Sequence, residues 1–256
     1  LLARPALLGA CPLFVFDSST RGAGKTLQVD AVAAVCTGRT LPPMTYPHED
    51  EEMEKILGGI AIAAPQAVKW DNVLGRLGCA ALNGVLTARD NRGFRVLGKS
   101  EVRELQWKTV MFATGNNVEL QADTGRRAVV ARLESELENP EDRSDFAHPV
   151  LLEWIQSERP RLVRAGLTVL RAWVVAGRPA LGCRPWGSFE AWSQLVPPAI
   201  LYAGGANVLE CRPSQTGEEE PEKAAMAVVL TELRRLTESG LTSKGILDLL
   251  YPGGRV

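Results

Sequence analysis

A glycine-containing segment that ends in Lys25-Thr26 constrains the fold of this chain more than any other feature. It follows an apolar run from Phe14 to Phe16, which predicts a short buried strand that stops at Asp17. An amphipathic stretch from Leu27 to Val35 comes next and predicts a helix. The order strand, loop, helix is the context that a phosphate-binding loop requires.

The loop matches the pattern G-x-x-x-x-G-K-[ST] except at its first position, where serine replaces glycine. Its residues are Ser19, Thr20, Arg21, Gly22, Ala23, Gly24, Lys25 and Thr26. In such a loop the backbone N–H groups cradle phosphates, the lysine reaches the β- and γ-phosphates, and the threonine hydroxyl ligates Mg²⁺. A glycine-rich turn before an ordinary helix is the alternative, but it gives no reason for Lys-Thr at the helix start. We therefore predict a site for ATP and Mg²⁺.

Composition sets limits on the kind of protein. The 256 residues are 45% hydrophobic and 23% charged with a net charge of −1, so nucleic-acid contact would have to come from a local basic patch. The five scattered cysteines and two histidines suggest neither a zinc site nor a disulfide framework and fit a reducing compartment. The sequence suggests no signal peptide and no membrane span. We expect the cytoplasm of a bacterium or phage-infected cell, and, since the chain starts without Met, a piece of a longer protein.

Strands and helices alternate over the first half of the chain. Helical patterns cover residues 53–64 and 73–88, and strand patterns cover 67–72, 107–113 and 128–133, with a turn at 91–93 before a further strand-like piece. This alternation predicts an α/β fold with a mostly parallel sheet covered by helices.

The second half has a helical pattern. Helices are predicted over residues 150–157, 162–176, 189–195 and 222–238, and another begins near Leu241, as in the first half of a helix-turn-helix or winged helix. We predict three parts: an ATPase core at 1–138, a helical region at 139–213, and a linker with the start of a winged-helix-like segment at 214–256. Trp173, Trp186 and Trp192 are expected to pack in the helical part and not to stack on bases.

Polar residues at the ends of predicted strands supply what nucleotide hydrolysis needs besides a cradle. Asp71 is positioned to hold Mg²⁺, and Asn72 stands where a glutamate base is often found, although an amide can orient water but cannot accept a proton. Asn116 or Asn117 can bond the γ-phosphate or its water, and Arg126 or Arg127 can contact phosphate. Alternatively, Asp71-Asn72 and Asn116-Asn117 could simply belong to tight turns, and one of the two arginines could be a surface ion-pair residue and nothing more.

A basic segment follows the second of these helical patterns. Arg92, Phe94, Arg95 and Lys99 could track a strand of nucleic acid and stack on a base, or form a solvated basic hairpin.

In this order the motifs resemble the AAA+ ATPase core of superfamily 3 helicases, in particular the helicase-like modules of phage and mobile-element replication proteins that are often joined to a primase. The likeness covers residues 14–133 and, more loosely, 161–168 and 186–193. It implies that Asn116 is a sensor of the γ-phosphate and that Arg126 or Arg127 is an arginine finger for a neighbouring subunit. The segment from Arg92 to Lys99 would be a hairpin that reaches single-stranded DNA in the pore of a hexameric ring.

Two residues depart from the general ATPase pattern. Ser19 replaces a glycine and Asn72 an acidic residue, which affects hydrolysis more than nucleotide binding. The expected function is an ATP-dependent DNA helicase or translocase in replication. The alternatives are an ATPase that remodels protein partners, and a non-hydrolysing module in which nucleotide gates recruitment of DNA or a primase.

Overall fold

The computed structural model describes residues 1–89, 91–95, 101–135, 137 and 139–213, together with residues 230, 231 and 234. The chain divides into two compact units, Leu1–Pro213 and Ser214–Val256. The account below concerns the first unit, because the predicted helix at 222–238 and the winged-helix start lie almost wholly outside the described residues.

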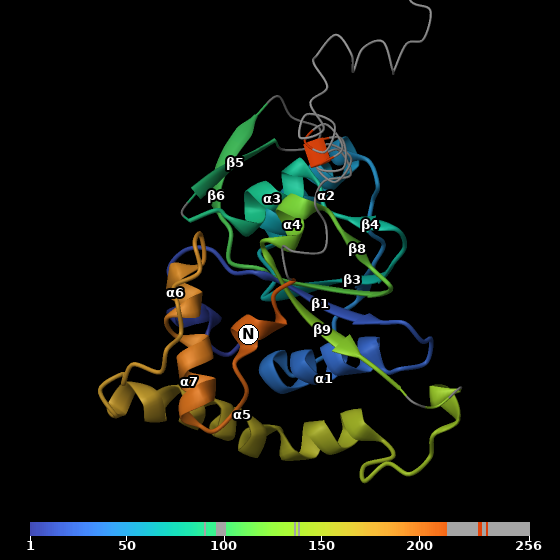
Figure 1. Cartoon of the computed structure of the whole chain (residues 1–256), viewed down its shortest axis with the longest axis vertical. Helices are drawn as coiled ribbons and strands as arrows, with labels where there is room; N and C mark the ends of the chain where they lie inside the picture. Colours follow the sequence, from blue (N-terminus) through green and yellow to red (C-terminus); the bar gives the residue numbers. More distant parts are fainter. Residues whose placement is uncertain are drawn as a thin grey trace, which may run out of the picture. The chain divides into compact units, whose positions relative to one another are not determined.

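The first unit is a mixed α/β structure (Figure 1). Its strands are β1 Leu13–Ser18, β2 Pro43–Met44, β3 Ala67–Val73, β4 Arg76–Leu77, β5 Asn91–Arg95, β6 Val102–Gln106, β7 Val110–Asn116, β8 Glu119–Leu120 and β9 Ala128–Leu133. Its α-helices are α1 Lys25–Thr37, α2 Asp50–Ala63, α3 Ala80–Leu86, α4 Ala122–Gly125, α5 Leu151–Val175, α6 Glu190–Ser193 and α7 Val196–Tyr202. The 3₁₀ helices are η1 Arg4–Ala6, η2 Pro140–Asp142 and η3 Val208–Cys211.

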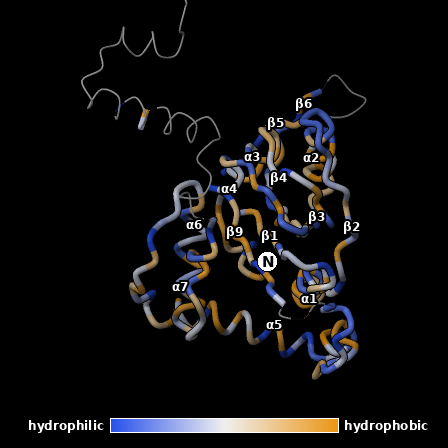
Figure 2. The backbone as a smooth tube through the Cα atoms, turned by 45° about the vertical axis from the view of Figure 1, so that its right-hand side comes forward, coloured by the Kyte–Doolittle hydropathy of each residue, from blue (hydrophilic) through white to orange (hydrophobic). Residues whose placement is uncertain are grey.

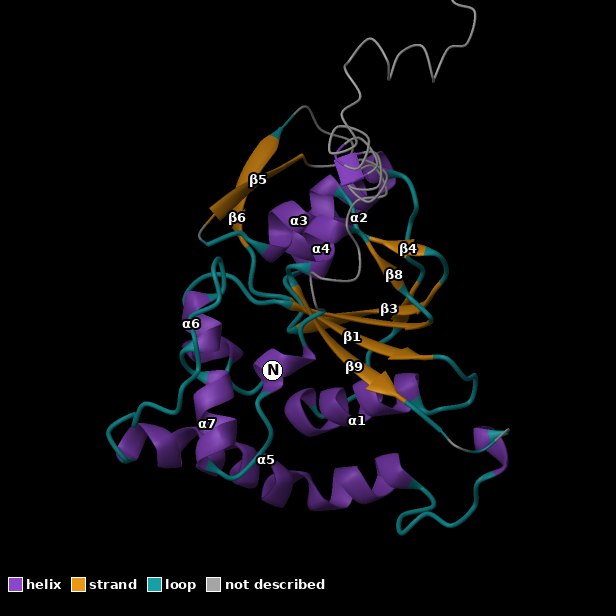
Figure 3. Ribbon diagram, viewed as in Figure 1, coloured by secondary structure: helices purple, strands orange, loops and turns teal. Residues whose placement is uncertain are grey.

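Five parallel strands form the central sheet in the order β2-β3-β7-β1-β9. Two of its three inner strands, β1 and β7, pair over five residues, from Phe14 with Phe112 to Ser18 with Asn116. Helices cover both faces of this sheet, as the purple and orange ribbons of Figure 3 show. The predicted mostly parallel, helix-covered sheet is thus confirmed.

The core lies on both sides of the sheet. One cluster packs α2 and α3 against β3 and β7 and includes Met53, Leu57, Trp70, Leu82 and Met111. The other packs α1 against the opposite face through Val29, Ala33 and Phe112. Figure 2 shows hydrophobic segments along β1 and β9; β1 alternates buried and half-buried residues at its start, whereas of β9 only Ala128 is buried.

The helical pattern at 73–88 predicted too long a helix. Val73 ends β3, residues 76 and 77 form β4, and only Ala80–Leu86 is helical. Gly75 and Gly78 explain the difference, since their φ values of 73° and 143° are incompatible with a right-handed helix. The prediction of a turn at 91–93 was also wrong, because those residues begin strand β5, which pairs antiparallel with β6.

The strand predicted at 107–113 is shifted toward the carboxyl end and runs from Val110 to Asn116. The carbonyl groups of Trp107 and Lys108 accept hydrogen bonds from the Arg4 guanidinium, at 2.9 and 3.0 Å, so they are not part of the sheet. The shift brings the whole of Thr114-Gly115-Asn116 into β7.

The two helices predicted at 150–157 and 162–176 are one helix, α5, with Pro160 inside it. α5 packs against α1 and α7, and Arg159 donates to the carbonyl groups of Ala34 and Val35 near the end of α1. Arg159, directly before the proline, thus anchors this part of α5 to α1. No described helix is long and apolar enough to cross a lipid bilayer.

The helix predicted at 189–195 is shorter, and α7, which was not predicted, follows it. Pro197 and Pro198 occupy the first turn of α7, where a missing N–H group costs nothing. The expected packing role of the tryptophans is confirmed: Trp173, Trp186 and Trp192 are all buried, and the last two share a cluster with Phe189.

Candidate nucleotide site

The loop between β1 and α1 has the geometry of a phosphate cradle. The Ser18 hydroxyl accepts a 3.1 Å hydrogen bond from the Thr20 N–H, which turns the chain away from the strand. Gly22 and Gly24 have φ values of 73° and 84°, and Gly24 caps the amino end of α1. Side chains are strained in this left-handed region, so glycine is required for the chain to enter the helix here. The residues from Ser19 to Thr26 therefore surround the amino end of a helix, where an anion is favoured.

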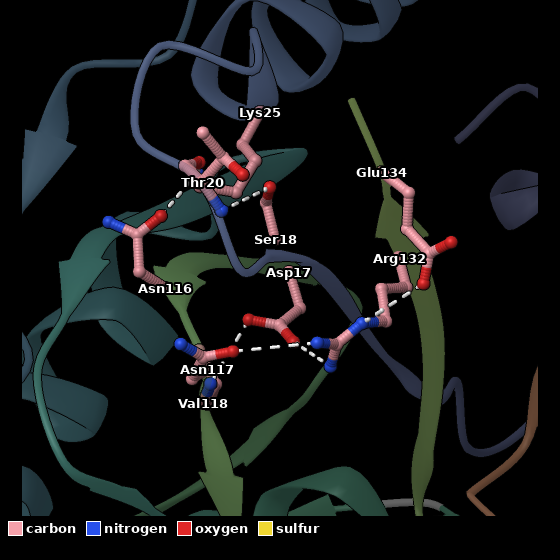
Figure 4. Close-up of polar contacts among 9 residues, drawn as sticks. All are labelled: Asp17, Ser18, Thr20, Lys25, Asn116, Asn117, Val118, Arg132 and Glu134. Carbon is pink, nitrogen blue, oxygen red and sulfur yellow. Dashed lines mark hydrogen bonds and ion pairs between the residues drawn. The ribbon is translucent and has the colours of Figure 1, made fainter. Parts of the chain in front are cut away.

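Lys25 joins this loop to the end of β7. Its Nζ lies 2.7 Å from Asn116 Oδ1 and 3.3 Å from the Thr20 carbonyl oxygen (Figure 4). Burial lowers the pKa of the Lys25 ammonium, while the nearby Asp17 acts in the opposite direction. A phosphate group would offset the desolvation of this cation, so Lys25 is suited to an anionic ligand.

Asp71 lies at the centre of a second set of contacts. Its Oδ1 accepts from the Thr26 hydroxyl and from the Thr114 hydroxyl, each at 2.9 Å. Thr114 in turn accepts a 3.0 Å hydrogen bond from the Asn72 N–H. Hydroxyl and carboxylate oxygens are the donors that Mg²⁺ prefers, so Thr26 and Asp71 fit a magnesium ion bound together with nucleotide phosphates.

Strand order explains why these distant segments meet. β7 lies between β1 and β3, and all three strands run parallel. Their carboxyl ends therefore share one edge of the sheet, which brings Asn116 between the loop after β1 and Asp71 on β3. Of the residues predicted from sequence, this edge unites Lys25, Thr26, Asp71 and Asn116.

A buried ion pair fixes helix α1 to the sheet. Lys69 on β3, 2% exposed, pairs with Asp30 on α1 at 2.8 Å. A buried charge of this kind needs its partner, so α1 is held in one position over β3.

Asn72 occupies an irregular point of β3. The pairing with β7 shifts register between Trp70 and Val73, and Asn72 has a φ of 53°. Asparagine tolerates this left-handed conformation better than most residues. The conformation gives a backbone reason for an amide at this position, in addition to the predicted role in orienting water.

Asn117 belongs to a neighbouring network that the sequence did not suggest. Asp17, buried at the end of β1, accepts from the Val118 N–H at 3.0 Å and pairs with Arg132 on β9 at 3.1 Å (Figure 4). The Asn117 N–H donates to the Ser18 carbonyl group. These bonds fix the chain directly after Asn116. In the sequence, the one feature that could have indicated this network is Asp17, a polar residue at the end of an apolar strand.

Arg126 and Arg127 both contact Asp123 within the same chain. Their hydrogen bonds lower the pKa of Asp123, with the larger effect from Arg127. The Arg126 side chain is 57% exposed and that of Arg127 21%. The structure brings neither arginine into contact with Lys25 or Asp71.

The basic segment divides into residues of different exposure. Phe94 is 4% exposed and stacks on Trp107, so the expectation that its ring stacks on a base is wrong, because the core covers it. Arg92 lies over Phe94 and against the bare Gly84 on α3. Arg95 is exposed, whereas Lys99 lies outside the described residues. Two acidic residues, Glu101 and Glu104, share the hairpin.

No protein-family model and no curated protein matches this chain. Among solved structures it is similar to two of JCV helicase, one of them bound to N-(4-(2-(thiazolo[5,4-c]pyridin-2-yl)phenoxy)phenyl)acetamide. The TM-scores are 0.35 and 0.34 at 12% sequence identity, and the matches cover 80% of this chain. They cover 51% and 50% of those chains, so this chain spans about half their length. Likeness at this level carries no argument about the site, which stands on its own geometry.

Proposed function

We propose that this chain binds Mg·ATP at the carboxyl edge of its sheet and hydrolyses it to drive movement along single-stranded DNA. One observation carries the proposal. Four polar side chains from three separate segments meet at the glycine loop, with Lys25 bonded to Asn116 and Thr26 bonded to Asp71. A purely structural turn gives no reason for this convergence of a cation, a hydroxyl, a carboxylate and an amide.

Each residue has a distinct part in the proposed reaction. Lys25 and the backbone N–H groups of residues 19–26 hold the phosphates, while Thr26 and Asp71 hold the magnesium ion. Water attacks the γ-phosphorus as the bond between that phosphorus and the β,γ-bridging oxygen breaks, which releases ADP, and the proton of the water passes to the phosphate product. Asn116 bonds the γ-phosphate or that water, and Asn72 orients the water without taking its proton.

The site is proposed to be completed by a second copy of the chain. Arg126 or Arg127 would reach the transferring phosphoryl group of a neighbouring subunit in a ring, which the resemblance makes a hexamer. A guanidinium supplied in this way stabilises negative charge as it develops. Replication of a phage or mobile element is the setting that the resemblance implies.

Steady-state ATP hydrolysis with and without single-stranded DNA tests the proposal. We expect turnover that DNA stimulates and that Lys25→Ala abolishes. Arg39→Ala serves as the control, because Arg39 is exposed and lies outside the proposed site. ATP that is bound but never hydrolysed, with or without DNA, would instead support a nucleotide-gated binding module.

The composition of the hairpin favours one second candidate. Its described strands carry Glu104 as well as Arg95 and Arg103, Glu101 directly precedes β6, and Phe94 is covered. An ATPase that remodels protein partners needs no basic pore hairpin. ATP hydrolysis that single-stranded DNA does not stimulate, and that Arg95→Glu combined with Lys99→Glu leaves unchanged, would favour this candidate over a DNA motor.

A further inference from the structure

The charge of the chain is unevenly distributed. Although the net charge is −1, residues 159–189 contain no aspartate, glutamate or lysine. Their only ionisable side chains besides Cys183 are six arginines: Arg159, Arg161, Arg164, Arg171, Arg178 and Arg184. Protein surfaces ordinarily mix charges of both signs, so a segment of this length with one sign alone points to an anionic partner.

Three of these arginines lie on the outer side of α5. At 3.6 residues per turn Arg161, Arg164 and Arg171 fall within an arc of about 80°, roughly opposite the buried Ile155 and Trp173. All three are exposed, and α5 uses its other side to pack against α1 and α7. In Figure 1 α5 lies on the far side of α1 from the sheet, so its outer side is the surface of this layer.

Arg159 differs from these three arginines, because it lies on the side of α5 that packs against α1. It faces α1 and donates to the carbonyl groups of Ala34 and Val35 at 3.2 and 3.0 Å. Its position in the fold is therefore structural, and it is not part of the exposed set. Arg178 and Arg184 follow α5 and are exposed, but Arg178 lies over the ring of the buried Trp173, so neither is counted in the outer face of the helix.

Most of the exposed cations lack an internal counter-ion. Arg161 pairs with Glu158. Within the part of the chain that the structure describes, Arg164, Arg171 and Arg184 form no ion pair with a carboxylate. We propose that the outer face of α5, defined by Arg161, Arg164 and Arg171, binds the phosphate backbone of nucleic acid.

The chemistry and the spacing of the face suit the phosphates of a nucleic-acid strand. The set consists of arginine alone, and a guanidinium group forms two parallel hydrogen bonds to a phosphate. Arg161 and Arg171 are separated by about 15 Å along the helix axis, which spans several phosphates of a strand. The tryptophans of the segment, Trp173 and Trp186, are buried. The face thus offers cations without exposed tryptophan rings, and its binding should not depend on base sequence.

This surface is independent of the proposed nucleotide site and of the β5–β6 hairpin. Its test therefore uses no ATP: affinity for a labelled 20-base-pair duplex is measured by fluorescence anisotropy over a range of salt concentrations. The variant is Arg164→Gln with Arg171→Gln, and the control is Arg76→Gln with Arg143→Gln, which removes the same charge from exposed residues elsewhere. Glutamine preserves helix propensity, so unfolding temperatures should match those of the unchanged chain.

We expect the α5 variant to bind more weakly and the slope of log affinity against log salt to fall in magnitude by about 1.8, for two lost phosphate contacts. The control should keep the slope of the unchanged chain, and Lys25→Ala should still bind DNA through α5. An α5 variant with undiminished affinity and slope would overturn the proposal and leave the face for an acidic protein. Failure of ATP hydrolysis alone would count against the proposed function and not against this surface.

Discussion

The Thr114 hydroxyl donates a 2.9 Å hydrogen bond to Asp71 Oδ1 and accepts one of 3.0 Å from the Asn72 N–H. Thr114 is 1% exposed, so it cannot contact a ligand directly. It acts as a positioning residue that fixes the carboxylate and the irregular end of β3 at once.

Replacing Thr114 by valine keeps the shape of the side chain and removes both bonds. The Asn72 N–H then loses its acceptor, and we expect the free energy of unfolding to fall by about 1–3 kcal/mol. The Mg²⁺ concentration for half-maximal nucleotide binding should rise, because Asp71 is no longer oriented. Thr114→Ser retains the hydroxyl and should restore the Mg²⁺ requirement. An unchanged Mg²⁺ titration in the valine variant would contradict this role.

The 2.7 Å contact between Lys25 and Asn116 predicts separate effects for the two residues. Asn116→Ala should keep the ATP affinity within a few-fold of that of the unchanged chain, since Lys25 and the loop still hold the phosphates. Its turnover should nevertheless fall about 10²-fold or more. Lys25→Ala should abolish binding itself. Calorimetric binding and single-turnover hydrolysis distinguish the two effects. Equal loss of affinity in both variants would show that Asn116 acts in binding and not as a sensor.

Nucleotide affinity should depend on pH through Lys25. Burial lowers the pKa of this ammonium from its ordinary value of 10.5, and only the charged form attracts phosphate. Affinity is therefore complete below the lowered pKa and is lost as pH rises through it, starting before pH 10.5. Lys25→Arg stays charged over this range, so its affinity should be flat with pH. A profile of the unchanged chain that matches the arginine variant would rule out Lys25 as the titrating group.

Asn72 combines a left-handed backbone with a predicted part in orienting water. Glycine adopts the observed φ of 53° without strain, so Asn72→Gly should fold with unchanged stability and bind Mg·ATP. Turnover should nevertheless fall, because the amide is gone. If the glycine variant hydrolyses ATP at the original rate, the backbone conformation alone accounts for asparagine at this position.

Both candidate arginine fingers contact Asp123, and we favour Arg126 of the two because of its exposure. Arg126 is the more exposed of the pair, at 57% against 21%, and can leave Asp123 for a neighbouring subunit more readily. Mixing Lys25→Ala chains with Arg126→Ala chains should recover part of the activity that each lacks alone, since some interfaces then combine an intact loop with an intact arginine. Recovery with Arg127→Ala but not with Arg126→Ala would reverse the assignment.

Much of the site could be predicted because its residues lie at the ends of strands with strong patterns. The apolar run before Asp17 and the Gly-Lys-Thr segment identify β1, the loop and α1 without further information. Asp71 and Asn116 followed from the same logic, since carboxyl ends of parallel strands meet at one edge. The parallel order of the sheet then brings them together.

The remaining features depend on contacts between distant segments. Thr114 looks like an ordinary strand residue until β3 and β7 are paired, and Arg132 meets Asp17 only through the pairing of β1 with β9. Phe94 seemed available to a base because its neighbours are charged, yet tertiary packing against Trp107 covers it. The glycines at 75 and 78 interrupt an apolar periodicity that by itself indicates a helix.

Calorimetric titration of ATP into the chain, with and without Mg²⁺, tests the central claim most directly. The account predicts one site per chain whose affinity depends on Mg²⁺, which loses its Mg²⁺ dependence in Asp71→Asn and disappears in Lys25→Ala. Nucleotide binding that is indifferent to both substitutions, or no binding by the unchanged chain, would contradict the assignment of this sheet edge as a nucleotide site.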